Sequence, residues 1–288
     1  FLDKFISDRE GSLYSKAALA NTIKRRNLGA VIVGSDQVWR PDYIPDVDTG
    51  SYFLDIEGDF QKISYAASFG KSEWSMPHRL PDVRRMLKGF DAVSLREQSG
   101  VSFCKEVLGR QDCTLALDPT MLVAPDFYSE MMVPRGQNGS YVLNYVLDEN
   151  PLVEEVLSKV VKGLAEGHKV VKLTLDDGEQ TLEVPNWVHA FREAKYVVTD
   201  SFHGTVFSIL FRKPFICIGN KSRGIDRFAS LLSLLGLDDR LVTETKETGA
   251  VSAPIDYDSV YSRLNTLRLE SRAFLEMALA PKMADVDV

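Results

Sequence analysis

Short apolar runs that alternate with helical patterns are the feature of this sequence that most limits its fold. A run such as 30–34 or 62–70 ends in glycine, and segments with helical spacing, such as 97–109, lie between the runs. Strands that alternate with helices in this way favour a parallel α/β sheet. We predict strands at residues 30–34, 62–70, 92–96, 114–118, 141–147, 169–175, 196–199 and 214–218.

The alternation occurs twice, which indicates two halves. Residues 134–140 (PRGQNGS) have the composition of a linker, and the pattern of strands and helices restarts after them. We therefore predict an N-terminal Rossmann-like half over 1–134, a C-terminal Rossmann-like half over 135–256 and a C-terminal helix over 257–288. Two such halves imply a cleft, where ligands are often bound. A return of the last helix to the first half is left open.

Composition excludes several classes of protein. The net charge of −7 argues against a nucleic-acid partner, because surfaces that bind nucleic acid are usually basic. The three cysteines show no CxxC spacing, which fits reduced cytosolic thiols better than disulfides or a zinc site. No apolar run approaches about 20 residues and no signal peptide is visible, so we predict no membrane span. Because the sequence begins at Phe1, we expect an N-terminal piece to be missing.

The segment 196–205 carries the clearest chemical pattern, because an apolar strand there leads into a polar helix start. Ligands of open α/β sheets bind where strands end and helices begin. His203 is therefore a candidate to move a proton or contact a phosphate, with a packed helix-capping histidine as the alternative. Asp200 either orients the imidazole or caps the helix. Four neighbours are candidates for an anion-binding nest: Thr199, Ser201, Gly204 and Thr205.

A second polar cluster, GSDQVWR at 34–40, follows a predicted strand. The cluster offers a hydroxyl, a carboxylate and an amide that can form hydrogen bonds with sugar hydroxyls. These groups belong to Ser35, Asp36 and Gln37. Trp39 is a candidate to stack on a sugar ring, although core packing is the better reading for this residue alone, because aromatic side chains dominate burial. The alternative for the whole cluster is a loop that satisfies its own backbone groups.

Arginines near strand ends are candidates for anion contacts. Arg96 ends the strand 92–96, where its planar fork could bind phosphate or carboxylate, and a structural pair with Glu97 is the alternative. Arg223 follows the strand 214–218 and is a second candidate, with a solvated charge at a helix start as an equal alternative. Arg227 is better explained as a solvated charge paired with its neighbour Asp226. The histidines and cysteines show no metal-ligand spacing, so we predict no metal site.

Five of these segments occur in an order that resembles the polysaccharide pyruvyl transferase family. The resemblance implies a GT-B-like architecture of two Rossmann-type halves facing across a cleft, with the N-terminal half truncated. It also implies transfer of a pyruvyl group from phosphoenolpyruvate to a hexose of a cell-surface polysaccharide or its precursor, forming a ketal. The matching segments are VIVGSDQVW (31–39), ISYAASFG (63–70), SLRE (94–97), LDPT (117–120) and VTDSFHG (198–204).

The resemblance assigns roles to the candidate residues. Phosphoenolpyruvate carries a carboxylate and a phosphate, so its site needs a general acid and a phosphate clamp, and no cofactor besides the donor is implied. His203 is the leading candidate for the acid or the phosphate contact. One branch of the family has Arg-Leu-His where this chain has Ser-Phe-His at 201–203. Either Arg96 or Arg223 replaces the missing cation, or the donor differs. The N-terminal half would bind the acceptor.

Two alternatives to a pyruvyl transferase are open at this point. One is a nucleotide-sugar glycosyltransferase of the GT-B type. The other is a non-catalytic protein of the same fold that binds glycan or phosphate, because fold alone does not determine function. For the leading reading we expect a glycan or a lipid-linked saccharide as acceptor and a cytoplasmic location. Peripheral contact with the inner face of the membrane is left open.

Overall fold

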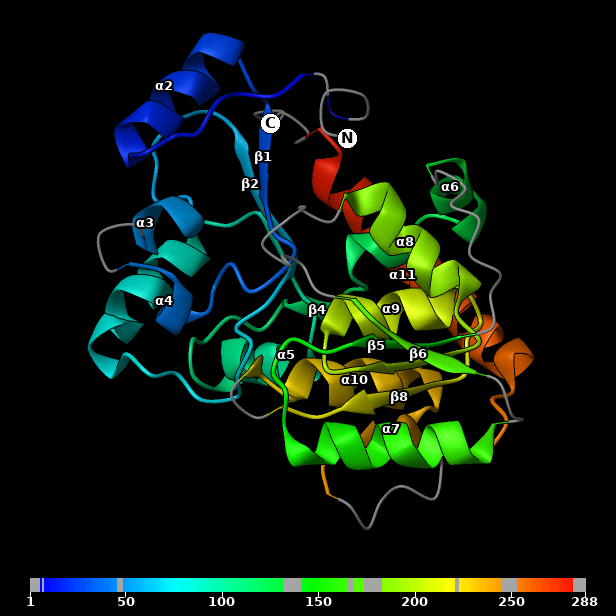
Figure 1. Ribbon diagram of the computed structural model, residues 1–288. Helices are drawn as coiled ribbons and strands as arrows, with labels where there is room; N and C mark the ends of the chain where they lie inside the picture. Colours follow the sequence, from blue (N-terminus) through cyan, green and yellow to red (C-terminus); the bar gives the residue numbers. More distant parts are fainter. Residues whose placement is uncertain are drawn as a thin grey trace. The chain divides into compact units, whose positions relative to one another are not determined.

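The computed structural model describes residues 6, 8–45, 49–131, 141–164, 168–173, 183–220, 223–244 and 253–281. The chain forms two compact units. We call Glu10–Leu122 with Asn265–Val288 the N-terminal unit, and Val123–Leu264 with Phe1–Arg9 the C-terminal unit. Each unit has a parallel sheet with helices packed on it, so the prediction of two α/β halves is confirmed (Figure 1). The predicted linker at 134–140 lies outside the described residues.

The N-terminal unit is built on a four-stranded parallel sheet in the order β1-β2-β3-β4. Its strands are β1 (Ala30–Val33), β2 (Gln61–Ala67), β3 (Ala92–Leu95) and β4 (Thr114–Leu115). Its helices are α2 (Lys16–Arg26), α3 (Thr49–Tyr52), α4 (Leu80–Lys88) and α5 (Gln98–Glu106). Three short 3-10 turns accompany them: η1 (Pro41–Tyr43), η3 (Pro77–Arg79) and η4 (Pro119–Met121).

Helix α2 shows how local sequence sets the ends of an element. The hydroxyl of Ser15 accepts a hydrogen bond from the backbone N–H of Ala18 at 3.1 Å and caps the helix N-terminus. The helix ends at Asn27, which takes the left-handed conformation (φ 49°) that asparagine tolerates. Ile23 is the buried residue of this helix. With so little apolar surface the helix has no clear amphipathic stripe, which is why its sequence pattern does not predict it.

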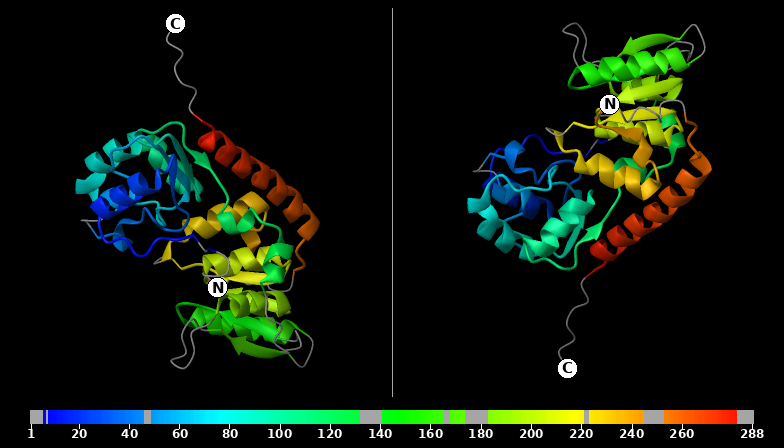
Figure 2. Two further views of the ribbon diagram at one scale, coloured as in Figure 1. Left: turned by 90° about the horizontal axis from the view of Figure 1, so that it is seen from above. Right: turned by 90° about the horizontal axis from the view of Figure 1, so that it is seen from below.

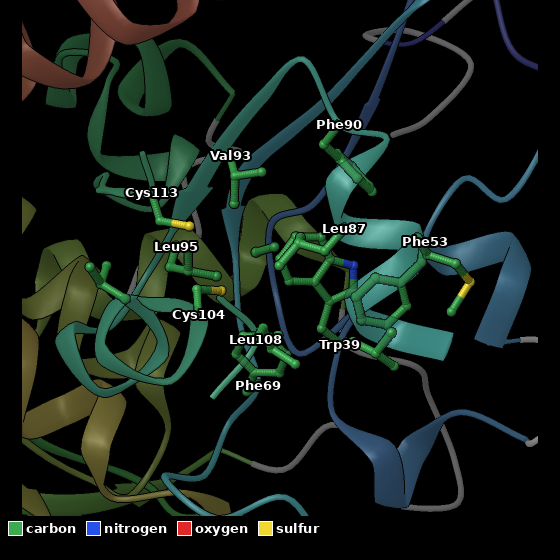
Figure 3. Close-up of a cluster of buried hydrophobic side chains, with 14 of the residues drawn as sticks. Trp39, Phe53, Phe69, Leu87, Phe90, Val93, Leu95, Cys104, Leu108 and Cys113 are labelled. Carbon is green, nitrogen blue, oxygen red and sulfur yellow. The ribbon is translucent and has the colours of Figure 1, made fainter. Parts of the chain in front are cut away.

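Trp39 lies in the core of the N-terminal unit (Figure 3). Its indole ring is fully buried and stacks on Phe53, with the ring centroids 4.8 Å apart and 8° between the planes. Phe69 and Phe90 contact the same ring at centroid distances of 5.4 and 5.6 Å. The indole Nε1 donates a hydrogen bond of 3.0 Å to the backbone carbonyl of Tyr52. The ring and its polar atom are therefore both used inside the fold.

The C-terminal unit has a five-stranded parallel sheet in the order β6-β5-β7-β8-β9. Helix α7 packs on the sheet through Val153, Val156 and Val160, α9 contacts β7 and β8, and α8 packs against α9. The strands are β5 (Tyr141–Tyr145), β6 (Lys169–Lys172), β7 (Tyr196–Thr199), β8 (Phe215–Ile218) and β9 (Leu241–Val242). The helices are α6 (Pro125–Glu130), α7 (Pro151–Gly163), α8 (Val184–Glu193), α9 (Phe202–Leu210) and α10 (Asp226–Leu235), with the 3-10 turn η6 (Asp238–Arg240).

Helix α11 (Tyr257–Leu279) is one long helix, and each unit includes part of it (Figure 2). In the C-terminal unit, the hydroxyl of Tyr261 donates a hydrogen bond of 2.6 Å to the carbonyl of Leu210. In the N-terminal unit, the hydroxyl of Ser271 accepts one of 3.0 Å from the backbone N–H of Leu117. The helix thus begins where the sequence predicts it, at 257, and contributes contacts to both units.

Candidate functional site

The order of the strands marks one edge of the C-terminal sheet as the place for a ligand. The chain passes from β5 outward to β6 and then returns to the other side of β5 to form β7. Tyr145 and Thr199, the last residues of β5 and β7, are partners in the register. The loops after these two strands therefore begin side by side at a topological switch point, where open α/β sheets bind their ligands.

The junction between β7 and α9 is held by its own hydroxyl groups. Thr199 Oγ1 donates to the carbonyl of Tyr145 at 2.6 Å and accepts from the N–H of Ser201 at 3.1 Å. Ser201 Oγ caps α9 by accepting from the N–H of Gly204 at 3.3 Å. The N–H and hydroxyl of Thr205 both donate to the carbonyl of Ser201. These four residues shape the junction, and their contact with an anion remains a prediction.

Gly204 is required by the closeness of the strand beneath it. A Cβ at this position would lie 2.3 Å from Thr199 Oγ1 and 3.1 Å from a ring carbon of Tyr145. We expect Gly204→Ala to lower the free energy of unfolding by about 1–3 kcal/mol, as overpacking of a core does. Urea denaturation measures this loss. Gly163→Ala is the matched control, because among the described residues its new Cβ meets no heavy atom within 4 Å outside its own helix. An equal loss in the two variants would contradict the explanation.

His203 lies in the first turn of α9 and differs from the rest of that helix in its exposure. The structure describes the whole helix, and every other residue in it is buried. The imidazole is partly exposed, and its ring lies edge-on to Phe202 with the centroids 5.7 Å apart. A titratable ring is thus accessible at the switch point, whereas the apolar side chains of the same helix are packed.

Asp200 is buried and holds the loop that follows β5. Its Oδ1 accepts from the N–H of Leu147 at 2.6 Å, and its Oδ2 accepts from the N–H of Asp148 at 3.0 Å. Burial raises the pKa of the Asp200 carboxyl, and these two backbone hydrogen bonds oppose the shift. The carboxylate therefore joins the loops after β5 and β7. Its predicted role in orienting the imidazole stays a prediction.

Arg223 is anchored at the same edge by a carboxylate that the sequence analysis missed. Asp148 Oδ1 accepts from Arg223 NH2 at 2.8 Å, and Asp148 Oδ2 accepts from Arg223 Nε and from Asn220 Nδ2, the latter at 2.7 Å. The hydrogen bonds from Arg223 lower the pKa of the Asp148 carboxyl. One sequence feature could have indicated Asp148: it directly follows the predicted strand 141–147.

Arg227 is buried, so its interpretation as a solvated charge paired with Asp226 is wrong. Its guanidinium lies 5.5 Å from the ring centroid of Phe202 and donates from NH2 to the carbonyl of Arg223 at 2.6 Å. Arg227 thus contacts the residue before His203 and holds the backbone of Arg223. A buried cation of this kind needs such partners, because burying an unpaired charge is costly.

The N-terminal unit has its own polar cluster at the carboxyl ends of β1, β3 and β4. Arg96 NH1 donates to Asp118 Oδ2 at 2.8 Å, and Arg96 NH2 donates to Asp36 Oδ1 at 3.1 Å. Ser35 Oγ donates to the same oxygen of Asp118 at 2.9 Å. The carboxylates that accept these hydrogen bonds from Arg96 are therefore Asp118 and Asp36, and Glu97 places a further negative charge near Arg96. Glu97, the partner considered from the sequence, accepts hydrogen bonds from Ser68 and from the backbone of 69–70.

The buried pair of Arg96 and Asp118 predicts a marked effect on stability. Both side chains are nearly inaccessible, at 1% and 2% exposure. We expect Asp118→Asn to lower the free energy of unfolding by about 3 kcal/mol, because it leaves a buried guanidinium without its full counter-charge. Asp112→Asn, whose carboxylate is 67% exposed beside Arg110, should stay within about 1 kcal/mol of the unmodified protein. Equal losses in urea denaturation would contradict this account.

The four residues predicted to bind the acceptor sugar differ in how exposed they are and in what they contact. Asp36 has a side chain that is 66% exposed, so it can contact a ligand. Gln37 Oε1 accepts a hydrogen bond of 2.9 Å from Arg40 NH1. Trp39 has no exposed face for a sugar, because it is fully buried. We therefore keep Ser35, Asp36 and Gln37 as candidates and assign Trp39 to the core.

Comparison with known proteins decides the family. The model of the family described as polysaccharide pyruvyl transferase matches residues 3–222. The chain belongs to the polysaccharide pyruvyl transferase family. This family member is thus an enzyme of that type, and its family implies a polysaccharide as acceptor. A search of curated proteins found no match.

Solved structures that can be superimposed on this family member include two with low sequence identity to it. One is described as a UDP-N-acetylglucosamine 2-epimerase from Listeria monocytogenes, with 11% identity, a TM-score of 0.48, and coverage of 92% of this chain and 72% of that chain. The other is the UDP-GlcNAc 2-epimerase from Neisseria meningitidis bound to UDP-GlcNAc, with 8% identity, a TM-score of 0.45, and coverage of 92% and 74%.

Within the described ranges, none of the helices combines the length and the apolar character that crossing a bilayer requires. In the same ranges, no three side chains of His, Cys, Asp or Glu are grouped so that they could hold a metal ion. The prediction that the reaction needs no metal stays a prediction.

Proposed function

We propose that this family member transfers a pyruvyl group from phosphoenolpyruvate to a hexose of a cell-surface polysaccharide or of its lipid-linked precursor, forming a cyclic ketal. The family membership supports the class of reaction. One observation supports the site above the others: His203 is the partly exposed residue of an otherwise buried helix at the switch point of the C-terminal sheet. Arg223 follows the neighbouring strand β8 and is anchored at the same edge.

The chemistry of the donor assigns the steps. The protonated imidazole of His203 donates a proton to the methylene carbon of phosphoenolpyruvate, and the adjacent carbon becomes electrophilic. One hydroxyl of the hexose attacks that carbon. A second hydroxyl then displaces inorganic phosphate and closes the ketal. One hydroxyl proton returns to the imidazole, and the other goes to the departing phosphate. Arg223 contacts the phosphate, since a guanidinium fork matches phosphate oxygens and stabilises the leaving group.

Arg96 is a weaker candidate for the phosphate than Arg223. Its guanidinium is buried and donates to two carboxylates, Asp118 and Asp36. An anion in contact with Arg96 would therefore have to compete with two negative charges already in place. We propose Asp36 as the first candidate to contact the acceptor sugar, because an exposed carboxylate accepts hydrogen bonds from sugar hydroxyls.

The donor and the cysteine thiols support a proposal about the cofactor and the cellular location of the reaction. Phosphoenolpyruvate is a substrate, and we propose no cofactor besides it. Cys104, Cys113 and Cys217 are free thiols. Free thiols are typical of the reducing cytoplasm, which supports a cytoplasmic location where phosphoenolpyruvate is supplied.

The proposed function is tested by incubating the purified protein with phosphoenolpyruvate and a cell-surface polysaccharide. We expect inorganic phosphate to be released only when the acceptor is present, together with a new ketal methyl signal in the proton NMR spectrum of the glycan. Consumption of a nucleotide sugar under the same conditions would instead indicate a glycosyltransferase. Binding of the glycan without any turnover would indicate a non-catalytic protein.

A further inference from the structure

Arg223 is held at two points, its guanidinium and its backbone carbonyl, by charged residues of the C-terminal unit. From the side-chain end, the Asp148 carboxylate accepts from Arg223 NH2 at 2.8 Å and from Arg223 Nε. From the backbone end, Arg227 donates to the carbonyl of Arg223 at 2.6 Å. A free arginine side chain has many rotamers, so these contacts hold in place a group that would otherwise sample many positions.

Asp148 is itself held by a buried residue. Asp200, which is 1% exposed, accepts a hydrogen bond of 3.0 Å from the backbone N–H of Asp148. Asn220 Nδ2 donates to Asp148 Oδ2 at 2.7 Å. A continuous set of hydrogen bonds therefore runs from the end of β7, through the loop after β5, to the segment after β8. All three segments follow carboxyl ends of neighbouring strands in the sheet.

The ion pair of Arg223 and Asp148 remains accessible to a ligand. The side chains of Arg223 and Asp148 are 37% and 40% exposed, in contrast to the buried pair of Arg96 and Asp118. A half-exposed salt bridge contributes little to stability, because water competes for both groups. Stability alone therefore gives a weak reason for this arrangement, and a fixed direction for the guanidinium gives a stronger one.

We propose that Asp148 is a positioning residue, which holds the Arg223 guanidinium in the orientation that receives the phosphate group of the donor. The proposal rests on the proposed function for the identity of the donor. Asp148 itself does not touch the phosphate, because two negative charges would repel each other. It acts by occupying the Nε and NH2 donors of Arg223 and so limiting the directions in which the guanidinium can face.

This proposal is tested by whether Asp148→Asn raises or lowers the affinity for phosphate. If Asp148 only repelled anions, Asp148→Asn would make phosphate bind more tightly, because a negative charge is removed. If Asp148 positions Arg223, the same substitution weakens phosphate binding, by about fivefold or more, since an oriented, charge-assisted hydrogen bond is lost. The two explanations therefore predict opposite directions for one measured dissociation constant.

The experiment measures binding of inorganic phosphate by isothermal titration calorimetry to the unmodified protein and to four variants. We expect weaker binding in Asp148→Asn and in Arg223→Lys, which keeps the charge but loses the fork. In the double variant, binding should be no weaker than in Arg223→Lys alone, because both substitutions remove the same contact. Glu155→Gln, which neutralises a surface carboxylate paired with Lys159 in the same unit, should bind phosphate unchanged.

Three results would overturn the proposal: equal or tighter phosphate binding in Asp148→Asn, fully additive losses in the double variant, or no phosphate binding by the unmodified protein. Thermal unfolding of each variant verifies that it is folded, and Arg223→Lys tests the same contact without altering Asp148. The same proteins are then assayed for release of phosphate from phosphoenolpyruvate. Absence of that activity in the unmodified protein would refute the proposed function, whereas the binding series decides separately on Asp148.

Discussion

Replacement of His203 by glutamine is expected to lower turnover with phosphoenolpyruvate by about 100-fold or more, which is the contribution of a well-placed general acid. Glutamine keeps a polar side chain of similar length but carries no proton that it can give to carbon. The affinity for the donor should change much less than the turnover, because the lost interaction belongs to the transition state. Steady-state kinetics of phosphate release with a saturating acceptor measure both quantities.

The matched control for this variant is His189→Gln. His189 lies on α8 of the same unit and is also partly exposed, so the same chemical change is made away from the β7–α9 junction. We expect the control to turn over phosphoenolpyruvate at the rate of the unmodified protein. Unchanged turnover in His203→Gln would remove His203 from the mechanism, even if the overall reaction were confirmed.

Replacement of Trp39 by alanine is expected to lower the free energy of unfolding by about 4 kcal/mol, the usual cost of deleting a large buried aromatic side chain. The variant loses the stacking on Phe53 and the hydrogen bond to the carbonyl of Tyr52. Urea denaturation followed by circular dichroism measures the change. The core therefore becomes less stable, with no direct effect on sugar recognition.

Tyr14→Ala is the control for this second variant, because Tyr14 is 90% exposed in the same unit. We expect its unfolding free energy to change by no more than about 0.5 kcal/mol. The competing hypothesis, in which Trp39 stacks on the sugar, predicts weak effects on stability and a large rise in KM for the acceptor. That outcome would show that the indole is accessible in solution.

The strands of the sheets could be predicted from the sequence because the spacing of apolar residues reflects which side chains are buried. The runs 30–34, 141–147 and 196–199 contain β1, β5 and β7. Elements with little buried apolar surface could not be predicted in this way. Strand β9 has two residues, Leu241–Val242, which is too short for any periodicity to be visible.

The partners of Arg96 show why neighbours in sequence mislead. The sequence suggested a pair with Glu97, the next residue. Glu97 acts on Arg96 through its charge, but it accepts its own hydrogen bonds from Ser68 and the backbone of 69–70. Arg96 instead contacts Asp118 and Asp36, which follow two other strands of the same sheet.

The contact between Asp148 and Arg223 was missed for a related reason. The two residues are 75 positions apart, and they meet because β5 and β8 both lie next to β7 in the sheet, which brings the loops after their carboxyl ends close together. The order of strands is a property of tertiary packing, which local patterns do not encode. The positions of His203 and Arg223 after strands could be predicted, but the pairing of Arg223 with Asp148 could not.

A crystal structure of the protein with phosphoenolpyruvate bound is the most direct test of the central claim. The account predicts that the phosphate lies within hydrogen-bond distance of the Arg223 guanidinium and that the methylene carbon faces the imidazole of His203. Phosphoenolpyruvate bound away from the β7–α9 junction, with His203 and Arg223 untouched, would contradict it.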